Sequence, residues 1–234
     1  NSGSAGVAEF DGNGAVTDSN GDTTTDVLNV DGVSYTFPVG DKTTVIVGDN
    51  TDGSALFSTA CVYGGPSNTL DDCGNVNAGI TNGGAMAGAS YDFGTGFTAA
   101  VGYAGPEGGV MTEESMDAYG INAAYTGDNY GVSLTYGVLE TSTTDEDTFT
   151  ALNGYYTPEG FPSISVGYEI GEDGSVTGSA DSLESFFLGL NWDEVGPGSA
   201  GIAFGTKTPT VENTDEQYMR SEERRVGKEC RSRW

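Results

Sequence analysis

Apolar residues alternate with small or polar residues through much of this 234-residue chain, and the alternation limits its fold more than any other property. In residues 130–138, the even positions are Tyr, Val or Leu and the odd positions are Gly, Ser or Thr. The same period of two recurs in residues 97–104, 163–170, 185–192 and 201–207, and more weakly in residues 27–37, 43–49, 84–93, 116–125 and 148–156. A period of two is typical of β-strands, and no segment shows the period of a helix. The chain is therefore predicted to be all-β, with ten visible strands.

The connections between these segments alternate in length. Tight turns rich in Gly, Asp and Pro fall at residues 39–42, 94–96, 126–129, 157–162 and 193–199, and longer, acidic connections lie at residues 50–83, 105–115, 142–147 and 171–182. Aromatic residues gather beside the tight turns: Phe37, Tyr91, Phe93, Phe97, Tyr125, Tyr130, Tyr155, Tyr156, Phe161 and Trp192. Short and long connections in turn, with aromatic residues at one end, are typical of an antiparallel up-and-down transmembrane β-barrel. About ten strands of such a barrel are visible in this chain.

The two faces of the predicted strands differ in chemistry. A soluble β-sandwich would fill a dry core with large apolar side chains, whereas the second face here carries Gly, Ser, Thr, Ala and Asn. Such a face suits a water-filled interior, and a single apolar face directed at lipid explains why only 36% of residues are hydrophobic. We expect Tyr130, Val132, Leu134, Tyr136, Phe186, Leu188 and Leu190 to point outward to lipid, and Ser133, Thr135, Glu169 and Asn191 to face water. Phe187 breaks the alternation.

Composition excludes several functions. Asp and Glu number 35 against 8 Lys and Arg, which leaves no basic face for nucleic acid. The chain has no His, which removes His-dependent catalysis and most zinc chemistry. The run Asp18-Ser-Asn20-Gly-Asp22 resembles the start of a calcium loop, but Thr23 replaces the required Gly and Asn29 the closing acid, so a solvated acidic loop is the favoured interpretation. We expect no enzyme activity, no cofactor and no metal site.

The two ends of the chain differ from its middle. Six of the eight basic residues fall within residues 220–234, and this segment resembles the in-frame translation of a sequencing adapter. We expect it to be a non-native, disordered tail, with a basic arm for anionic partners as the alternative. The chain starts at Asn1 without a Met or a visible signal peptide, so we expect residues 1–219 to be an internal fragment of a barrel.

Four runs carry a resemblance to a family: residues 35–45 (YTFPVGDKTTV), 60–70 (ACVYGGPSNTL), 162–168 (PSISVGY) and 191–198 (NWDEVGPG). They resemble the cyanobacterial outer-membrane porins described as carbohydrate-selective or iron-uptake porins, over about residues 27–210. The resemblance implies an outer-membrane barrel of about sixteen strands for passive passage of small hydrophilic solutes. Members usually also carry a signal peptide and an N-terminal domain that grips the cell wall, both of which are missing here.

Residues of a pore can be nominated from this pattern. Rings of acidic side chains favour cations, and the native part of this chain is strongly acidic. Hydration of the surface or binding of divalent cations at lipid headgroups is an equally open role for the loop acids. The candidates that line or constrict the pore are Asp49, Asp52, Asp71, Asp72, Asp92, Glu169, Asn191 and Lys207. Outside the tail only Cys61 and Cys73 remain, and an even count in an exported protein favours a disulfide.

The sequence therefore predicts an outer-membrane porin that passes sugars, ions or iron by diffusion and prefers cations. The alternative is a soluble, acidic, β-rich adhesin or calcium-binding structural protein of the cell surface. Expected partners are small hydrophilic solutes and outer-membrane lipid, with a homo-oligomer as a further option. The cell wall is a partner only through the missing N-terminal domain.

Overall fold

The fold of the chain is known from a computed structural model, which describes residues 4–11, 16–17, 23–24, 29–64, 73–75, 77–80, 83–110, 112, 115–142, 144–174, 182–196, 198–206, 210–211 and 218–226. All ten predicted strands are present, each close to its predicted range. They are β4 (Asn29–Val39), β5 (Thr43–Asp49), β6 (Ala85–Asp92), β7 (Phe97–Gly105), β8 (Ala118–Thr126), β9 (Tyr130–Glu140), β10 (Glu146–Tyr156), β11 (Ser163–Glu172), β12 (Ser182–Val195) and β13 (Gly198–Thr206).

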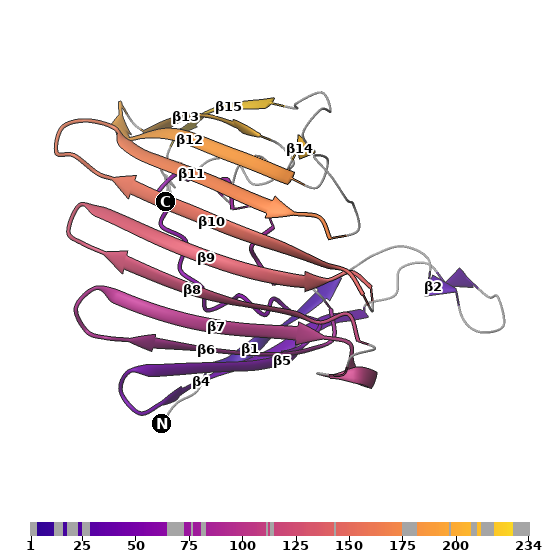
Figure 1. Cartoon of the computed structure of the whole chain (residues 1–234). Helices are drawn as coiled ribbons and strands as arrows, with labels where there is room; N and C mark the ends of the chain where they lie inside the picture. Colours follow the sequence, from indigo (N-terminus) through magenta and orange to yellow (C-terminus); the bar gives the residue numbers. More distant parts are fainter. Residues whose placement is uncertain are drawn as a thin grey trace.

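Each of these strands pairs antiparallel with its neighbours in the chain, so the sheet is up-and-down from β4 to β13 (Figure 1). Leu134 of β9, for example, lies opposite Ala123 of β8 and Leu152 of β10. The prediction of an all-β, antiparallel up-and-down fold is confirmed. The sheet is extended by β1 (Ser4–Asp11), which pairs with β4, by β15 (Tyr218–Val226), which pairs with β13, and by β14 (Thr210–Val211), which pairs with β12. Among the described residues no pairing joins β1 to β15, so the sheet is open rather than closed.

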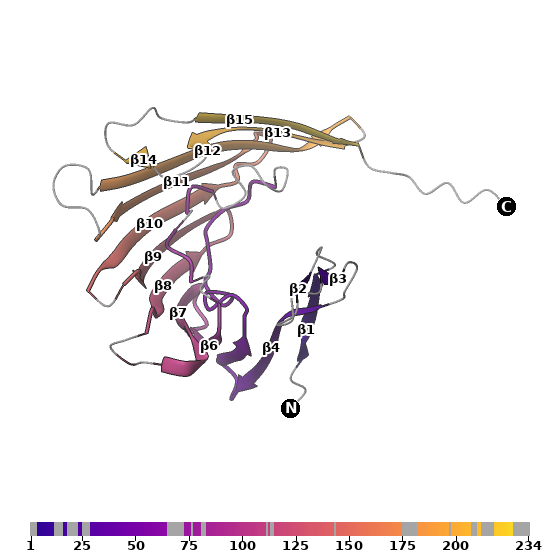
Figure 2. The ribbon, with the colours of Figure 1, turned by 90° about the vertical axis from the view of Figure 1, so that its right-hand side faces the viewer.

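The sheet curves strongly, and the described residues of the connection between β5 and β6 lie inside the curve (Figure 2). We call this connection, residues 50–83, the link. The concave side that it covers is the inner face, and the convex side is the outer face. The tight turns all lie at one end of the strands and the longer connections, including the start of the link, at the other (Figure 1). We call these the turn end and the loop end.

The remaining elements are small. The strands β2 (Val16–Thr17) and β3 (Thr23–Thr24) form a separate ribbon, and a 3-10 turn, η1 (Glu107–Gly109), lies in the connection between β7 and β8.

In the part of the chain that is described, no helix is long and apolar enough to span a membrane.

The segment predicted to be a disordered tail is partly ordered. Residues 218–226 form β15, in register with β13 from Thr206 opposite Tyr218 to Gly198 opposite Val226. The edge of a sheet presents unpaired backbone N–H and C=O groups, and these can pair with a segment of almost any sequence. The expectation of disorder is therefore wrong for residues 220–226. That the tail is non-native stays a prediction.

The core lies between the link and the inner face. One cluster joins Ile80 of the link to Ile46, Met86, Ala104 and Ala118 of the sheet, and a second joins Ala78 of the link to Phe149 and Ala151. A third cluster consists of Tyr63, Cys73, Phe187 and Ala203. The part of the inner face beneath the link is thus packed and dry, which differs from the water-filled interior predicted from its composition.

Candidate functional site

A row of side chains crosses the inner face at one level of the sheet. Pairing in register aligns Asn122 of β8, Thr135 of β9, Ala151 of β10, Glu169 of β11 and Ser185 of β12. These side chains are all nearly inaccessible, with between 0% and 3% of their surface exposed. Of the residues predicted to face water, Thr135 and Glu169 belong to this row, and Ser133, which is 2% exposed, lies on the same face, so that prediction is wrong for these three. They lie on the expected face, but the link covers them.

The first part of the link, residues 50–64, which we call the outgoing limb, crosses this face in an extended conformation. Its backbone N–H groups donate to inner-face side chains at every second residue, so one edge of the limb faces the sheet. The bonds run from Ser58 N to Asn122 Oδ1 (2.9 Å), from Ala60 N to Ser133 Oγ (2.8 Å) and from Val62 N to Ser165 Oγ (3.1 Å). Asn122 Nδ2 also donates to the Ser58 carbonyl at 3.1 Å. The polar side chains of the inner face thus act as partners for a backbone that has left water.

The second part of the link, from Cys73 to Ile80, is the returning limb. At its start the sheet side chains donate hydrogen bonds and the link carbonyl oxygens accept them. Asn153 Nδ2 donates to the Cys73 carbonyl oxygen and Ser185 Oγ donates to the Gly74 carbonyl oxygen, both at 2.8 Å. The limb then meets the start of the link, where Gly53 N donates to the Ile80 carbonyl oxygen, and Asn50 N donates to the carbonyl oxygen of Gly84, each at 2.8 Å. Side chains of β8 to β12 therefore anchor the link on the inner face.

Glu169 is the one carboxylate among these anchors in the described part of the inner face. Its Oε2 accepts from the backbone N–H groups of Asn77 and Ala78, both at 2.9 Å, and its Oε1 accepts from Asn77 Nδ2 at 3.0 Å. The side chain is 1% exposed. Hydrogen bonds to an ionised acceptor are stronger than those between neutral groups, so this carboxylate is the strongest single anchor of the returning limb.

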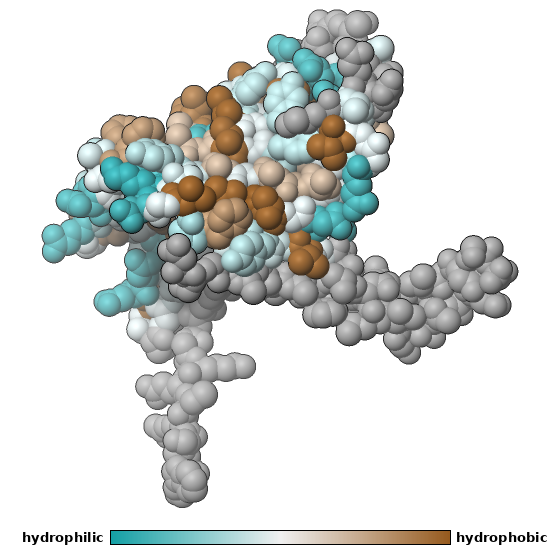
Figure 3. Space-filling view, turned by 90° about the horizontal axis from the view of Figure 1, so that it is seen from below, coloured by the Kyte–Doolittle hydropathy of each residue, from teal (hydrophilic) through white to brown (hydrophobic). Residues whose placement is uncertain are grey.

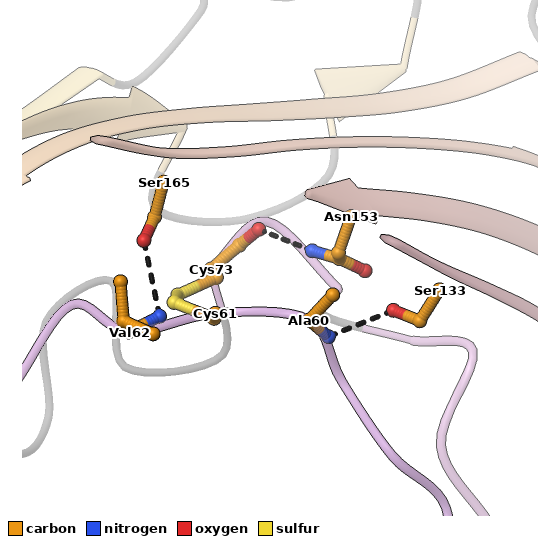
Figure 4. Close-up of a disulfide and its surroundings, with 7 residues drawn as sticks. All are labelled: Ala60, Cys61, Val62, Cys73, Ser133, Asn153 and Ser165. Atoms are coloured by element: carbon orange, nitrogen blue, oxygen red, sulfur yellow. Dashed lines mark hydrogen bonds between the residues drawn. A yellow bond between two sulfur atoms is a disulfide. The ribbon is translucent and has the colours of Figure 1, made fainter. Parts of the chain in front are cut away.

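A disulfide joins the two limbs where they lie side by side. Cys61 and Cys73 are bonded, with their Cα atoms 6.4 Å apart and a sequence separation of 12 residues. Figure 4 shows that the bond lies among the anchors at Ser133, Asn153 and Ser165. The disulfide expected from the cysteine count is therefore present in the structure, in the stretch of the link that crosses the sheet.

An aromatic pair and two glycines complete the contact between the link and the inner face. The ring of Tyr63 meets that of Phe187 edge-on, with centroids 5.4 Å apart. Phe187, the residue that breaks the alternation of β12, thus points inward because the link supplies an apolar partner. Glycines elsewhere let the backbones touch: a Cβ at position 167 would collide with the Cys73 carbonyl oxygen, and one at position 102 with that of Gly53.

The other acidic candidates among the described residues, Asp52, Asp92 and Asp49, lie in three different places. Asp52 lies exposed on the link, where Oδ1 accepts from Ser54 N at 2.7 Å and Ser54 Oγ at 2.6 Å. Asp92 shares the inner face but lies exposed beside a tight turn, with Oδ1 accepting from Gly94 N at 2.7 Å. Asp49 ends β5 on the same face as Val47, which is the outer face. The structure therefore brings Asp52 to the link, leaves Asp92 at the turn end and places Asp49 away from both.

Of the four remaining candidates for the pore, only Asn191 is among the described residues. Asn191 is half-buried on the inner face near the turn end, where its Nδ2 donates to Asp193 Oδ1 at 2.7 Å. Asp71, Asp72 and Lys207 lie outside the described residues. Within the described ranges, no three or more His, Cys, Asp and Glu side chains gather in a way that could hold a metal ion.

Large apolar side chains are exposed on the outer face from β4 to β13. Ile121 is 58% exposed, Leu152 57% and Leu134 50%. The other predicted outward residues lie on the same face, Tyr130, Val132, Tyr136 and Leu188 exposed and Phe186 and Leu190 half-buried. Figure 3, which views the molecule from below, shows hydrophobic residues gathered between hydrophilic residues on either side.

The rings of Phe97, Tyr125 and Tyr130 form a continuous row at the turn end of the outer face, which we call the aromatic chain. The rings of Phe97 and Tyr125 have centroids 4.6 Å apart, and those of Tyr125 and Tyr130 lie 5.5 Å apart. Tyr91 and Phe93 make a further pair at 4.8 Å. The aromatic residues that the sequence places beside the tight turns therefore meet across neighbouring strands.

No protein-family model and no curated protein matches this chain. Solved structures of bacterial porins are similar to it. An engineered mutant of the Rh. blastica porin is 14% identical, with a TM-score of 0.53 over 86% of this chain and 68% of that chain. The anion-selective porin of Comamonas acidovorans is 13% identical, with a TM-score of 0.48 over 88% of this chain and 58% of that chain. The first of these likenesses shows that the sheet described above has a porin-like fold.

Proposed function

We propose that this chain is part of an outer-membrane porin, through which small hydrophilic solutes pass by diffusion. The observation that carries the proposal is the contrast between the two faces of one curved sheet. Leu134 and Leu152 are at least half exposed on the outer face, whereas their sequence neighbours Thr135 and Asn153 are buried inside the curve, where Asn153 donates to the link and Thr135 accepts from Asn122. Transfer of such apolar side chains from water stabilises a protein by about 1.5–3 kcal/mol each, and lipid is the solvent that an apolar face of this extent fits.

The aromatic chain at the turn end supports the same setting. Tyrosine and other aromatic rings gather at the level of lipid headgroups in outer-membrane barrels. Tyr125 and Tyr130 lie at the turn end of β8 and β9, and hydrophilic residues occupy the turns beyond them, so these rings would lie at the headgroup level of an outer membrane. A soluble adhesin would gain nothing from an aromatic band at one end of an exposed apolar face, so the porin is the better interpretation.

The link is proposed to narrow the channel. It lies inside the curve, is crossed by a disulfide and is fixed at several points, so its exposed side chains would hold fixed positions in a lumen. Asp52 is exposed on the link, and Asp71 and Asp72 belong to the same segment of sequence. With a net charge of −27 for the chain, we propose a preference for cations. Monovalent ions and sugars are the first solutes to test, and iron complexes follow from the sequence resemblance.

The test is single-channel recording, in a planar lipid bilayer under a salt gradient, of the full-length porin of which this chain is proposed to be part, without the tail. We expect stepwise conductance and a reversal potential that shows cation preference and weakens at high salt, where charges are screened. Asp52→Asn should reduce that preference, whereas Asp41→Asn, an equal change of charge on an exposed tight turn, should leave it unaltered. A protein that is extracted without detergent and gives no conductance would favour the adhesin, and an anion preference would leave size exclusion as the only selectivity.

A further inference from the structure

The outer face is hollowed where small residues replace large ones on three neighbouring strands. Ala89 of β6, Ala99 of β7 and Ala123 of β8 form the floor of a groove of about 480 Å³, and Ala99 lies directly opposite Ala123. Its walls are larger outward side chains: Tyr91, Val101, Ile121, Leu134 and Tyr136. An apolar chain laid along the strands would fill this groove.

A second hollow, of about 710 Å³, continues the first toward the loop end. Val101, Ile121 and Tyr136 line both, so the two form one groove along β7–β9. The chemistry changes along its length, because the second part is also lined by Tyr103, Tyr119, Thr112, Asp117 and Glu140. One end of the groove is therefore apolar and the other is aromatic and acidic.

Hydrogen bonds fix the acidic end. Asp117 Oδ1 accepts from Tyr103 Oη at 2.9 Å and from Ser115 Oγ at 2.8 Å. The backbone N–H of Asp117 donates to Glu140 Oε2 at 3.2 Å, and Glu140 N donates back to the Asp117 carbonyl oxygen at 2.8 Å. Both carboxyl groups are thus held beside the tyrosine rings. Lys42 is the one basic residue whose side chain is described, and it lies at the turn end, where it donates to the Phe93 carbonyl oxygen.

We propose that this groove binds one amphiphile whose polar head carries a protonated amine. The apolar chain would lie on Ala99 and Ala123, and the ammonium group would lie at the acidic end among Tyr103, Tyr119 and Glu140. A cation is attracted both by ionised carboxylates and by the faces of aromatic rings. An anionic head would meet only like charge there. The site goes beyond the proposed channel and does not require it, because the strand residues that the ligand would contact, Ala99, Ala123, Tyr103, Tyr119 and Glu140, lie on the outer face.

The ligand chemistry is tested by titration of the full chain, purified in a neutral maltoside detergent, with dodecylammonium. We expect saturable binding of one equivalent. Dodecanoate supplies the same length of chain with an anionic head, and butylammonium supplies the head with little chain. Both should bind at least about tenfold more weakly, since each loses one of the two contributions. Equal binding of dodecylammonium and dodecanoate would overturn the assignment of an amine head.

Two variants test the location. Glu140→Gln should weaken dodecylammonium binding by about fivefold to tenfold, while Glu172→Gln, an equal loss of charge on the outer face of β11, should have no effect. Ala123→Phe should abolish binding by filling the groove. Gly154→Phe is its matched control, because a Cβ at that outward position of β10 has only ordinary contacts, the nearest at 3.5 Å.

The outcomes separate this site from the proposed channel. Unchanged binding in both Glu140→Gln and Ala123→Phe would overturn the inference, and so would a change of oligomeric state in Ala123→Phe, which would identify a second copy as the occupant. Conductance is recorded separately in the bilayer. Channels without dodecylammonium binding would contradict only the groove, and binding without channels would contradict only the porin.

Discussion

The carbonyl oxygen of Cys73 occupies the space in which a Cβ atom of residue 167 would have to lie, so the returning limb of the link touches the backbone of β11 at Gly167. Asn153 holds the same carbonyl from β10, with its Nδ2 2.8 Å away. Together the missing side chain and the amide define one place where the link is seated on the sheet. The closeness of this contact makes the position of the link sensitive to a single methyl group.

Gly167→Ala should displace the link, because the added methyl group must push Cys73 from the sheet. Overpacking of this kind costs about 1–3 kcal/mol, measured as a lower free energy of unfolding in urea. Gly154→Ala on the adjacent strand is the control, since its Cβ would make only ordinary contacts on the outer face, the nearest at 3.5 Å. Equal stability of the two variants would show that the link does not rest on Gly167 in solution.

Glu169→Gln keeps the shape of the side chain but removes the charge that accepts from Asn77 and Ala78. An amide NH₂ group would also face those donors. The loss should be about 1.5–3 kcal/mol, seen as faster hydrogen exchange at the Asn77 and Ala78 amides. Glu172→Gln, an exposed residue of the same strand, should leave these rates unchanged. If both variants protect the two amides equally, Glu169 does not anchor the link.

Reduction of the Cys61–Cys73 disulfide should lower stability by about 3 kcal/mol, the entropic value for a loop of this length. The expected result is a lower thermal midpoint in the presence of reductant, and no further change in the double variant Cys61→Ser, Cys73→Ser. Thiol titration of the denatured chain should find only Cys230 before reduction. Reactive Cys61 and Cys73 in unreduced, exported protein would contradict the bond.

Leu134→Arg places a charge on the exposed apolar face and should impair assembly in lipid by about 2–4 kcal/mol. Thr135→Arg should also destabilise the protein, because Thr135 is 1% exposed and its Oγ1 accepts from Asn122 Nδ2 at 2.8 Å. Asn191→Arg, on a half-buried part of the inner face, should be tolerated. Recovery of heat-modifiable folded protein measures all three, and good assembly of Leu134→Arg would place that side chain away from lipid.

The strands could be predicted from the sequence because alternation is a local property. In β9, the face on which a residue lies can be inferred from the residues directly before and after it. The predicted segment 130–138 therefore falls within Tyr130–Glu140. The direction of the link could not be predicted in the same way. Ser133 and Ser165 suit a wet lumen as well as they suit a docked backbone, because water and peptide groups need the same hydrogen-bonding partners.

One signal for the docked link was present in the sequence but needed the structure to be understood. Phe187 breaks the alternation of its strand, and a large apolar residue on a polar face indicates an apolar partner. Tyr63 is that partner. Its contact with Phe187 joins residues far apart in the chain, so it could not be predicted from the sequence around either residue.

The anchors of the link join residues that are widely separated along the chain, and this dictates an order of assembly. Val62 is held by Ser165, 103 residues later, and Gly74 by Ser185, 111 residues later. Hairpins closed by tight turns form at little entropic cost, whereas contacts over such spans form late. The link must therefore wait for β12. Cys61 and Cys73 are only 12 residues apart, so their disulfide can close first and present the two limbs, already joined, to the finished sheet.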